Sequence, residues 1–430
     1  MDIVIIGGGP AGRTASIEAA SLGENVTLIE RGALGGTCLN EGCMVVCGFN
    51  DFTRFLLDTK NFRDLGITDK NIDFDFSNLV KGVKDTVTKI SHVLEHETKE
   101  AGAEIVKGTA RIEKENVIVN NDEFGYDKLI IATGARPFIP EINGAENALT
   151  YKDILKLNEL PEKINIIGSG VIAAEFAGIF STLGTDVNIL CRNQFLGALD
   201  VDIKDYVTKN LLPEVLIHEN VQTKEIHEDY LSTDYGKIDG KTLFATGTIP
   251  NSEIAFDIVD LNEKGHIIVD KKMQTSNSNI YAAGDVARKI GNTPISRAEG
   301  VVAARNACGI YQEMDYSFIP YAINLYYDVA FLNSENQQKG MEGYIPGSSG
   351  PGSFWRTLEG VTGLTKLNVN QDRGINKIFS ISPSSRTSMA YMSKLLREGQ
   401  KIDDFDDFIE VHPSTDAIYK LMRFFARFEY

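Results

Sequence analysis

The chain begins MDIVIIGGGPAG (residues 1–12), in which an apolar segment runs directly into glycines spaced as G-x-G-x-x-G. A helix-compatible segment follows, and a second apolar segment, NVTLIE, ends on Glu30. This order of strand, glycine turn, helix, strand and acid is typical of a dinucleotide-binding unit. Gly7 permits a tight turn, Gly9 lets backbone amides approach a pyrophosphate, and Gly12 allows close packing of helix on strand. We therefore expect a nucleotide here, with Glu30 accepting hydrogen bonds from its ribose.

The same pattern recurs at residues 164–192, between the apolar segments INIIG and DVNILC. Gly168 and Gly170 occupy the first two glycine positions, and Ala173 takes the third, which a slightly wider gap between helix and strand accommodates. A cysteine holds the position of the ribose-binding acid, and Arg192 follows it. Because a guanidinium suits a 2′-phosphate, this unit favours NADP over NAD, with a solvated surface charge as the alternative for Arg192. Two such units predict two bound nucleotides.

The length and charge of the chain narrow the class of protein. We expect two or three domains, because 430 residues exceed what one compact core usually holds. The formal net charge of −17 argues against sequence-independent binding to nucleic acid or to anionic lipid, since both need a basic face. The sequence offers neither a signal peptide nor a run of about 18 apolar residues for a membrane span. We expect a cytoplasmic protein, where close cysteines are more often a redox or metal pair than a structural disulfide.

Two further segments match each other. LIIATG (129–134) and LFATG (243–247) are both apolar runs that close on Ala-Thr-Gly, and each can return the chain from a nucleotide domain. IYAAGDV then places Asp285 after an apolar segment, where its carboxylate can reach a polyol hydroxyl. Beyond residue 318 the sequence becomes aromatic and loop-rich before a final helical pattern, which indicates a separate C-terminal domain.

Taken jointly and in order, seven motifs resemble those of the class I pyridine nucleotide–disulfide oxidoreductases, the family that includes dihydrolipoamide dehydrogenase and glutathione reductase. The motifs are GGGPAG, GGTCLNEGC, ATGARP, GSGVIAAEFA, ATGTIPN, IYAAGDVA and VHPSTD. The resemblance implies an α/β protein with two Rossmann-like three-layer domains, for FAD and for NAD(P), and an α+β C-terminal domain that forms a homodimer. The domains expected are 1–148 with 251–317 for FAD, 149–250 for NAD(P) and 318–430 for dimerisation.

The resemblance also implies a reaction. Electrons would pass from the nicotinamide through the flavin to a disulfide between Cys38 and Cys43, and from there to a small disulfide substrate, with dihydrolipoamide the default couple. Cys43 would face the flavin and Cys38 would attack the substrate. The residues agree with this role, because a C-x4-C pair at the start of a helix lies in a positive field that favours the reactive thiolate. A zinc site is disfavoured because no second ligand pair follows at suitable spacing.

Two other histidines and two other cysteines of the chain are interpreted as residues without a role in the reaction. No metal ligand is expected, and His92 and His96, four residues apart among glutamates, are interpreted as part of a solvated helix face. Cys191 and Cys308 are interpreted as packing residues.

The contacts with the cofactors that the resemblance implies are Gly7, Gly9, Gly12, Glu30, Arg31, Gly36, Thr37, Ala110, Thr133, Gly134 and Asp285 for FAD, and Gly168, Gly170, Ala173, Arg192 and Gly247 for NAD(P).

The sequence departs from the family pattern at C-x4-C-x-P-x-K, because Val45 replaces the proline and Cys47 replaces the lysine. In the family that lysine pairs with a glutamate, which is retained here as Glu175. Without its cation, Glu175 should have a raised pKa or recruit water or another donor. Three interpretations of Cys47 stay open: a thiol relay to Cys43, which lies one helical turn away; a substitution that tunes the flavin by removing a charge; and a packing residue.

A second departure lies near the C-terminus. The family's acid–base pair is a histidine with a glutamate five residues on, supplied by the partner subunit. His412 matches the histidine, but Ala417 stands at the glutamate position and Asp416 one residue earlier. Because a carboxylate fixes the imidazole tautomer, its loss should slow proton transfer. His412 stays the general acid–base candidate, and Asp416 replaces the glutamate only after a local shift.

Two functions follow from these departures. The first is a homodimeric FAD enzyme that exchanges electrons between NAD(P)H and a small disulfide–dithiol couple. The second is a flavoprotein that has lost ordinary disulfide turnover and acts as an electron-transfer partner within a larger redox complex. Arg386, in PSSRTS, stays open between binding an anionic group and being an exposed charge. The identity of the disulfide substrate does not follow from the sequence.

Overall fold

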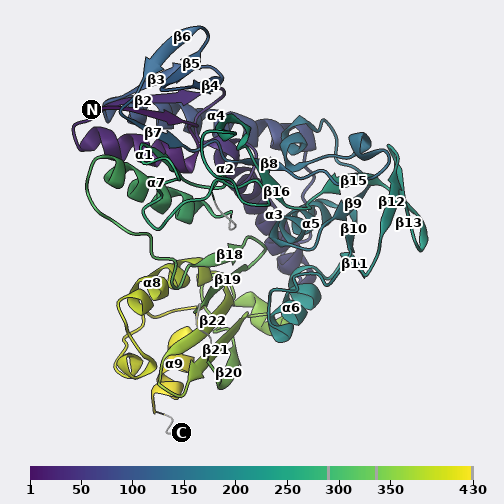
Figure 1. Cartoon of the computed structure of the whole chain (residues 1–430). Helices are drawn as coiled ribbons and strands as arrows, with labels where there is room; N and C mark the ends of the chain where they lie inside the picture. The colour runs from purple at the N-terminus through teal and green to yellow at the C-terminus, as the bar shows by residue number, and fades with distance from the viewer. Residues whose placement is uncertain (288–290, 335–337, 428–430) are drawn as a thin grey trace.

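The first glycine turn belongs to a parallel sheet whose strands come from residues 2–131 and from residues 280–282. The computed structural model describes residues 1–287, 291–334 and 338–427. Within them, five parallel strands take the spatial order β17-β7-β1-β2-β3. Figure 1 shows the N-terminal strands beside α7, a helix from much later in the chain. The strands are β1 (Asp2–Ile6), β2 (Asn25–Glu30), β3 (Ala103–Lys107), β7 (Lys128–Ile131) and β17 (Ile280–Ala282).

Helix α1 (Pro10–Ser21) begins immediately beyond the glycine turn. Proline at its first position fits a helix start, because its missing N–H would have no intrahelical partner there. A Cβ at Gly12 would lie 1.9 Å from the carbonyl oxygen of Gly7, so only glycine allows the helix to approach the strand this closely. The close approach aims the N-terminal amides of α1 at the carboxyl end of β1.

A second parallel sheet carries the second glycine turn. Its order is β11-β10-β9-β15, and the turn leads into α5 (Val171–Leu183), which ends at Gly184 in the left-handed conformation. Because parallel strands are buried on both faces, four consecutive residues of β9, Ile164 to Ile167, are buried rather than every second one. The strands are β9 (Lys163–Ile167), β10 (Asp186–Cys191), β11 (Leu216–Glu219) and β15 (Lys241–Phe244), with α6 (Val201–Tyr206) between β10 and β11.

Small antiparallel units complete both nucleotide regions. Each large parallel sheet has a three-stranded antiparallel partner, and one two-stranded unit, β8 with β16, joins the regions. These strands are β4 (Ala110–Glu113), β5 (Asn116–Val119), β6 (Asp122–Gly125), β8 (Ala135–Pro137), β12 (Thr223–Ile226), β13 (Tyr230–Thr233), β14 (Gly236–Asp239) and β16 (Thr248–Pro250).

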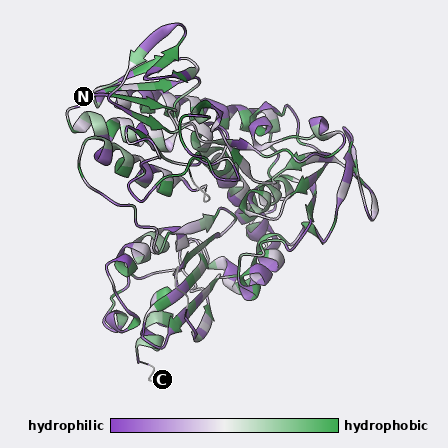
Figure 2. Ribbon diagram, in the orientation of Figure 1, coloured by the Kyte–Doolittle hydropathy of each residue, from purple (hydrophilic) through white to green (hydrophobic). Residues whose placement is uncertain are grey.

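The C-terminal region is built on an antiparallel sheet of order β18-β19-β22-β21-β20. Its helices α8 (Ser385–Arg397) and α9 (Ile418–Arg427) pack on this sheet in Figure 1. Figure 2 shows both helices with hydrophilic and hydrophobic residues in alternation, as expected for helices with one buried face. The strands are β18 (Tyr321–Ile323), β19 (Asp328–Asn333), β20 (Gly340–Pro346), β21 (Leu364–Asn370) and β22 (Ile375–Ser382).

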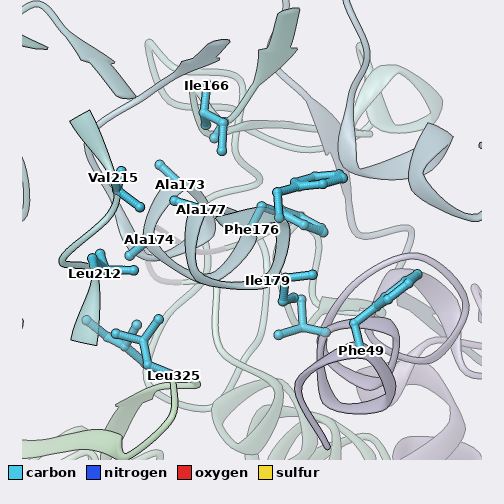
Figure 3. Packing of buried hydrophobic residues seen from close by; sticks show 14 of the residues in the cluster. Phe49, Ile166, Ala173, Ala174, Phe176, Ala177, Ile179, Leu212, Val215 and Leu325 are labelled. Carbon is cyan, nitrogen blue, oxygen red and sulfur yellow. The ribbon is translucent and has the colours of Figure 1, made fainter. Parts of the chain in front are cut away.

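One hydrophobic core crosses all three regions. Helix α3 (Cys43–Asp64) of the first region contributes Phe49, which packs near α5 of the second region in Figure 3. Leu325 reaches the same core from the C-terminal region. Helix α4 (Phe76–Glu100) covers another side of α3 with an apolar stripe, and α2 (Gly36–Asn40) precedes α3. The shared core therefore joins the helices α2, α3 and α4 of the first region to the second parallel sheet and to the C-terminal sheet.

The predicted α/β class, with two Rossmann-like sheets and an α+β C-terminal part, is confirmed by these sheets. Residues 280–282 return to the first sheet after the second sheet is complete, which supports the proposed discontinuous domain of residues 1–148 and 251–317. The three domain boundaries remain a proposal. None of the described helices is both long and apolar enough to cross a membrane.

The packing of α7 (Thr293–Ala307) on α1 predicts the effect of a single methyl group. A Cβ at Gly300 would lie 2.3 Å from the carbonyl oxygen of Ala11, so Gly300→Ala should force the two helices apart. We expect a loss of about 1–3 kcal/mol in the free energy of unfolding, the usual cost of overpacking. Thermal unfolding followed by circular dichroism measures it as a lower midpoint.

Gly82→Ala is the matched control, because nothing lies within 4 Å of a Cβ at this exposed position of α4. It should stabilise the protein by about 0.5–1 kcal/mol, since alanine favours a helix interior over glycine. Equal midpoints for the two variants would contradict the close contact between α1 and α7.

Candidate active site

A large cavity lies where the strands of the two parallel sheets end. Its volume is about 1770 Å³, and residues that directly follow β1, β7, β9 and β15 line it. Ligands of open α/β sheets bind at the carboxyl ends of the strands, and pockets for one small ligand hold roughly 300–1,000 Å³. The cavity therefore has room for two nucleotides that meet between the sheets.

The glycine turn of the first sheet is held open by Glu30. One carboxylate oxygen of Glu30 accepts a hydrogen bond from the backbone N–H of Gly8 at 2.6 Å, and the other accepts from Gly32 at 2.7 Å. Glu30 also lines the cavity together with Arg31. The predicted ribose acceptor thus stands at the correct end of β2, beside the N-terminus of α1.

The first half of the cavity fits FAD on the chemistry of its polar groups. The hydroxyl of Tyr151 is buried and has no hydrogen-bond partner among the described residues, although it lines the cavity. Asp285 lines the same region, and burial raises the pKa of its carboxyl. A hydroxyl without a partner and a desolvated carboxyl need polar groups from a ligand, which the phosphates and polyol of FAD would supply.

The second half of the cavity lies at the second glycine turn. The thiol of Cys191, at the end of β10, donates to the carbonyl oxygen of Gly168 at 3.2 Å, so it holds the turn from the place where an acid was expected. Arg192 follows it, exposed and on the cavity wall. The site thus offers a nucleotide a cation in place of a carboxylate.

Three expected cofactor residues lie outside the cavity wall. Gly12 lies beneath the first turn and Ala173 is buried in α5, so both serve helix packing rather than direct contact. Ala110, on β4, packs against an apolar cluster that its small sheet shares with the first parallel sheet, and the cavity does not reach this cluster. The expected residues that do line the cavity are Gly7, Gly9, Glu30, Arg31, Gly36, Thr37, Cys38, Cys43, Cys47, Thr133, Gly134, Gly168, Gly170, Glu175, Arg192, Gly247 and Asp285.

Cys38 and Cys43 face each other within this cavity, from α2 and from the first residue of α3. Both are free thiols here. The pKa of the Cys38 thiol is lowered to about 6, chiefly because the Cys43 thiol donates a hydrogen bond to it, with smaller contributions from Thr293 and Arg297. The same contact and burial raise the pKa of Cys43. The pair therefore holds one proton on Cys43 and presents Cys38 as a nucleophilic thiolate.

Helix α7 supplies two groups to the thiols that sequence reasoning missed. The hydroxyl of Thr293 lies 3.8 Å from the sulfur of Cys43, and the positive charge of Arg297 helps to lower the pKa of Cys38. Both residues belong to the first turns of α7 and line the cavity. Their only signal in the sequence was an arginine soon after Thr-Pro in a helix-compatible segment.

Cys47 and Glu175 meet at Asn324, a buried residue of the C-terminal region. The side-chain amide of Asn324 donates to the sulfur of Cys47 at 3.4 Å, and its backbone N–H donates to a carboxylate oxygen of Glu175 at 2.8 Å. Burial raises the pKa of Glu175 to about 8 and also raises the pKa of Cys47. Both outcomes expected for Glu175, a raised pKa and another donor, are found.

Asp416, the possible substitute for the missing glutamate, bonds other groups in the structure. His412 is exposed, in the loop before α9, and does not line the cavity of its own chain. One oxygen of Asp416 accepts from the hydroxyl of Ser380 at 3.2 Å and from the backbone N–H of Ile418 at 3.1 Å. Asp416 is buried at the start of α9 and stabilises that helix end, and among the described residues it makes no hydrogen bond to His412.

Of the remaining candidates, only Arg386 lines the cavity. His92 and His96 are exposed on α4, and no group of three or more possible metal ligands occurs in the described part of the chain. Cys308 directly follows α7 and is half-buried away from the thiol pair. Arg386, which the sequence left open, lines the cavity from α8.

Comparisons with known proteins agree with this geometry. The family model described as pyridine nucleotide-disulphide oxidoreductase matches residues 1–300. An uncharacterized protein of Methanocaldococcus jannaschii is 32% identical over 98% of this chain and 98% of its own length. Dihydrolipoyl dehydrogenase of Bacillus subtilis is 28% identical over 97% of this chain and 94% of its own length.

A solved structure shows the same fold. The HOCl-induced flavoprotein disulfide reductase RclA of Escherichia coli superposes with a TM-score of 0.87, at 23% identity, over 98% of this chain and 99% of that one. At this identity the structure supports the fold alone, whereas the family model and the relatives that match along their whole length show the family. The chain therefore belongs to the class I pyridine nucleotide–disulfide oxidoreductases, FAD-dependent enzymes that couple NAD(P)H to disulfide chemistry.

Proposed function

We propose that this protein reduces a small disulfide, or oxidises the matching dithiol, through Cys38 and Cys43. The observation that carries the proposal is the place of the thiol pair, in one cavity between the two nucleotide turns. When bound, FAD would supply two-electron transfer between the nicotinamide and the pair. The reaction then needs from the chain a nucleophilic thiolate, a second thiol to resolve it, and an acid for the leaving group.

The thiol chemistry follows from the charge distribution in the pair. The Cys38 thiolate attacks one sulfur of the substrate disulfide, which forms a mixed disulfide and releases the first substrate thiolate. Cys43, which holds the proton, then loses it and attacks the Cys38 sulfur, which releases the second substrate thiol and leaves a disulfide between Cys38 and Cys43. The hydroxyl of Thr293, 3.8 Å from Cys43, and the charge of Arg297 stabilise the thiolate in each step.

The acid for the leaving thiolate is His412 of a second copy of the chain. This histidine is exposed on a loop of the C-terminal region, away from its own cavity, which is where a residue donated to a partner subunit should lie. Large apolar side chains around it are also exposed, as on a surface that a homodimer covers. They include Ile409 at 89% and Val411 at 83% exposure. We place the dimer in the cytoplasm, where a thiol pair stays reducible.

The nucleotide is NADP rather than NAD. Arg192, which directly follows β10, is exposed on the cavity wall, where its guanidinium can bind a 2′-phosphate. The preceding position holds no carboxylate that would repel this phosphate. The neutral thiol of Cys191 occupies that position and is engaged with Gly168.

Anaerobic reduction tests the proposed function directly. NADPH should bleach the flavin band of the purified protein and open a Cys38–Cys43 disulfide, so that two new thiols appear in a thiol assay. Cys38→Ser and Cys43→Ser should each lower turnover of small disulfides by on the order of 10³-fold or more, because nucleophile and resolving thiol act as a unit. Flavin bleaching with no new thiols would reject the disulfide reaction and favour an electron-transfer flavoprotein.

Replacing Arg192 tests the choice of nucleotide. Arg192→Ala removes the only group proposed to meet a 2′-phosphate, so kcat/KM for NADPH should fall by roughly 10- to 100-fold, the usual worth of a charge-assisted hydrogen bond. The value for NADH should change little. Steady-state reduction of a disulfide dye with each nucleotide measures both, and an equal loss for the two nucleotides would contradict this role.

The raised pKa of Glu175 predicts a pH dependence. Its carboxyl is neutral below a pKa of about 8 and becomes negative above it. A negative charge in the cavity disfavours an anionic reduced flavin, so the flavin midpoint potential should fall more steeply with pH above 8 than below it. Glu175→Gln, which stays neutral, should remove this break. Spectroscopic redox titrations between pH 6 and 9.5 check it, and identical curves would show that Glu175 does not titrate beside the flavin.

A further inference from the structure

Arg386 occupies an unusual position for a cation. It is the second residue of α8, and a positive charge in the first turn of a helix is opposed by the helix dipole. An ion pair holds it there: its guanidinium lies 2.7 Å from a carboxylate oxygen of Asp328, the first residue of β19. The ion pair with Asp328 therefore offsets the unfavourable position of Arg386 in the helix.

The side chain of Arg386 is 47% exposed and stands at the wall of the active-site cavity. Arg386 lines the cavity together with Cys47 and Glu175, although α8 belongs to the C-terminal region and the other two belong to the nucleotide regions. Its charge lowers the pKa of both groups, against the larger opposing effect of burial. A residue of the C-terminal sheet thus acts on a thiol and a carboxyl of two other helices.

Neutral donors hold these two groups in place. Asn324 bonds both the sulfur of Cys47 and the carboxylate of Glu175. The oxygen of its side chain accepts from Asn50 at 2.5 Å, so the amide orientation is fixed from α3. Within residues 1–287, 291–334 and 338–427, Glu175 forms no ion pair. Asn324 therefore holds Cys47 and Glu175 in place, but as a neutral residue it does not balance a negative charge on either of them.

A second arginine on the same aspartate does not take this role. Arg54 also bonds Asp328, at 2.9 Å, but its guanidinium is turned to the backbone carbonyls of Leu325 and Tyr326, and it does not line the cavity. Asp328 therefore lies between a structural arginine on one side and Arg386 on the cavity side.

We propose that Arg386 is the positioning residue that favours the charged forms of Cys47 and Glu175 against the effect of their burial. The C-terminal region thereby supplies the positive charge that helix α3 lacks at residue 47. Cys47 is then a tuned thiol within an electrostatic cluster rather than an electron relay. The part of this proposal that concerns the flavin rests on the proposed function, whereas the part that concerns the Cys47 thiol does not.

The charges around Cys47 determine whether each variant raises or lowers the reactivity of its thiol. Arg386 favours its thiolate, while Cys43 and Asp51 on its own helix oppose ionisation. Asp328→Asn removes the negative charge that partly neutralises Arg386 but keeps a side-chain oxygen that can accept from the guanidinium, so the arginine should stay in place and act more strongly on Cys47. Changes at Arg386 and Asp328 should therefore shift the reactivity of Cys47 in opposite directions.

The test follows alkylation of Cys47 by iodoacetamide in the Cys38→Ser/Cys43→Ser protein, with mass spectrometry to separate it from Cys191 and Cys308. Arg386→Met should lower the rate at pH 7.5 by about three- to ten-fold, because the thiolate fraction changes ten-fold per pKa unit. Arg386→Lys, which keeps the charge, should restore most of it. Asp328→Asn should raise the rate.

Arg397→Met is the matched control, since Arg397 lies on the same helix but pairs with Asp315 at 3.0 Å, outside the cavity. It should leave the rate unchanged. If Arg386→Met and Arg397→Met give the same rate, or if Arg386→Met and Asp328→Asn shift it in the same direction, the proposal is wrong. The opposite-sign pair also guards against simple unfolding, which would expose Cys47 in both variants.

A second readout concerns the flavin. In the holoenzyme with its native cysteines, Arg386→Met should make the flavin midpoint potential more negative than Arg397→Met does, because a nearby cation stabilises the anionic reduced flavin. A changed alkylation rate with an unchanged potential would confirm the action on Cys47 and reject the action on the flavin. An unchanged rate overturns the proposal even if disulfide turnover is normal.

Discussion

The packing of α3 against α5 is the contact on which the arrangement of the active site depends. α3 begins at Cys43, and its buried face carries Phe49 into the core that α5 and Leu325 complete (Figure 3). The buried amide of Asn50 adds direction to this apolar contact, because it bonds the carbonyl of Leu325 at 3.0 Å. Apolar packing alone would allow α3 to slide, but the amide bond fixes its register relative to the C-terminal sheet. The thiols at its first turns are placed accordingly.

This shared core explains why three regions with separate sheets build one site. The glycine turns present backbone amides, but they hold no reactive side chain of their own. The reactive groups arrive from α2, α3, α5, α7 and α8. The shared core holds α2, α3 and α5, whereas α7 packs in the core of the first sheet and α8 in the core of the C-terminal sheet. A small shift of α3 would move Cys43 away from Thr293 and Cys47 away from Asn324 together. The site is therefore sensitive to packing far from the reacting sulfurs.

Much of the fold followed from local sequence patterns, because a glycine turn between an apolar strand and a helix has few structural alternatives. The two nucleotide turns, Glu30 and the thiol pair all lie where their spacing placed them. The sequence could not show Asn324 or the direction of Arg386, since both reach the cavity across a sequence separation of more than 100 residues. The sequence could not show the hydrogen bonds of Asp416 for the same reason: its partners, Ser380 and the start of α9, are set by tertiary packing rather than by distance along the chain from His412.

The central claim is that Cys38 and Cys43 form the redox disulfide while Cys47 stays a thiol. All three cysteines lie in one tryptic peptide, residues 32–54, because arginines at positions 31 and 54 bound it. Alkylation of the air-oxidised protein followed by fragmentation of this peptide should find one alkyl group, on Cys47, and a link between Cys38 and Cys43. Three alkyl groups, or a link that involves Cys47, would contradict the account.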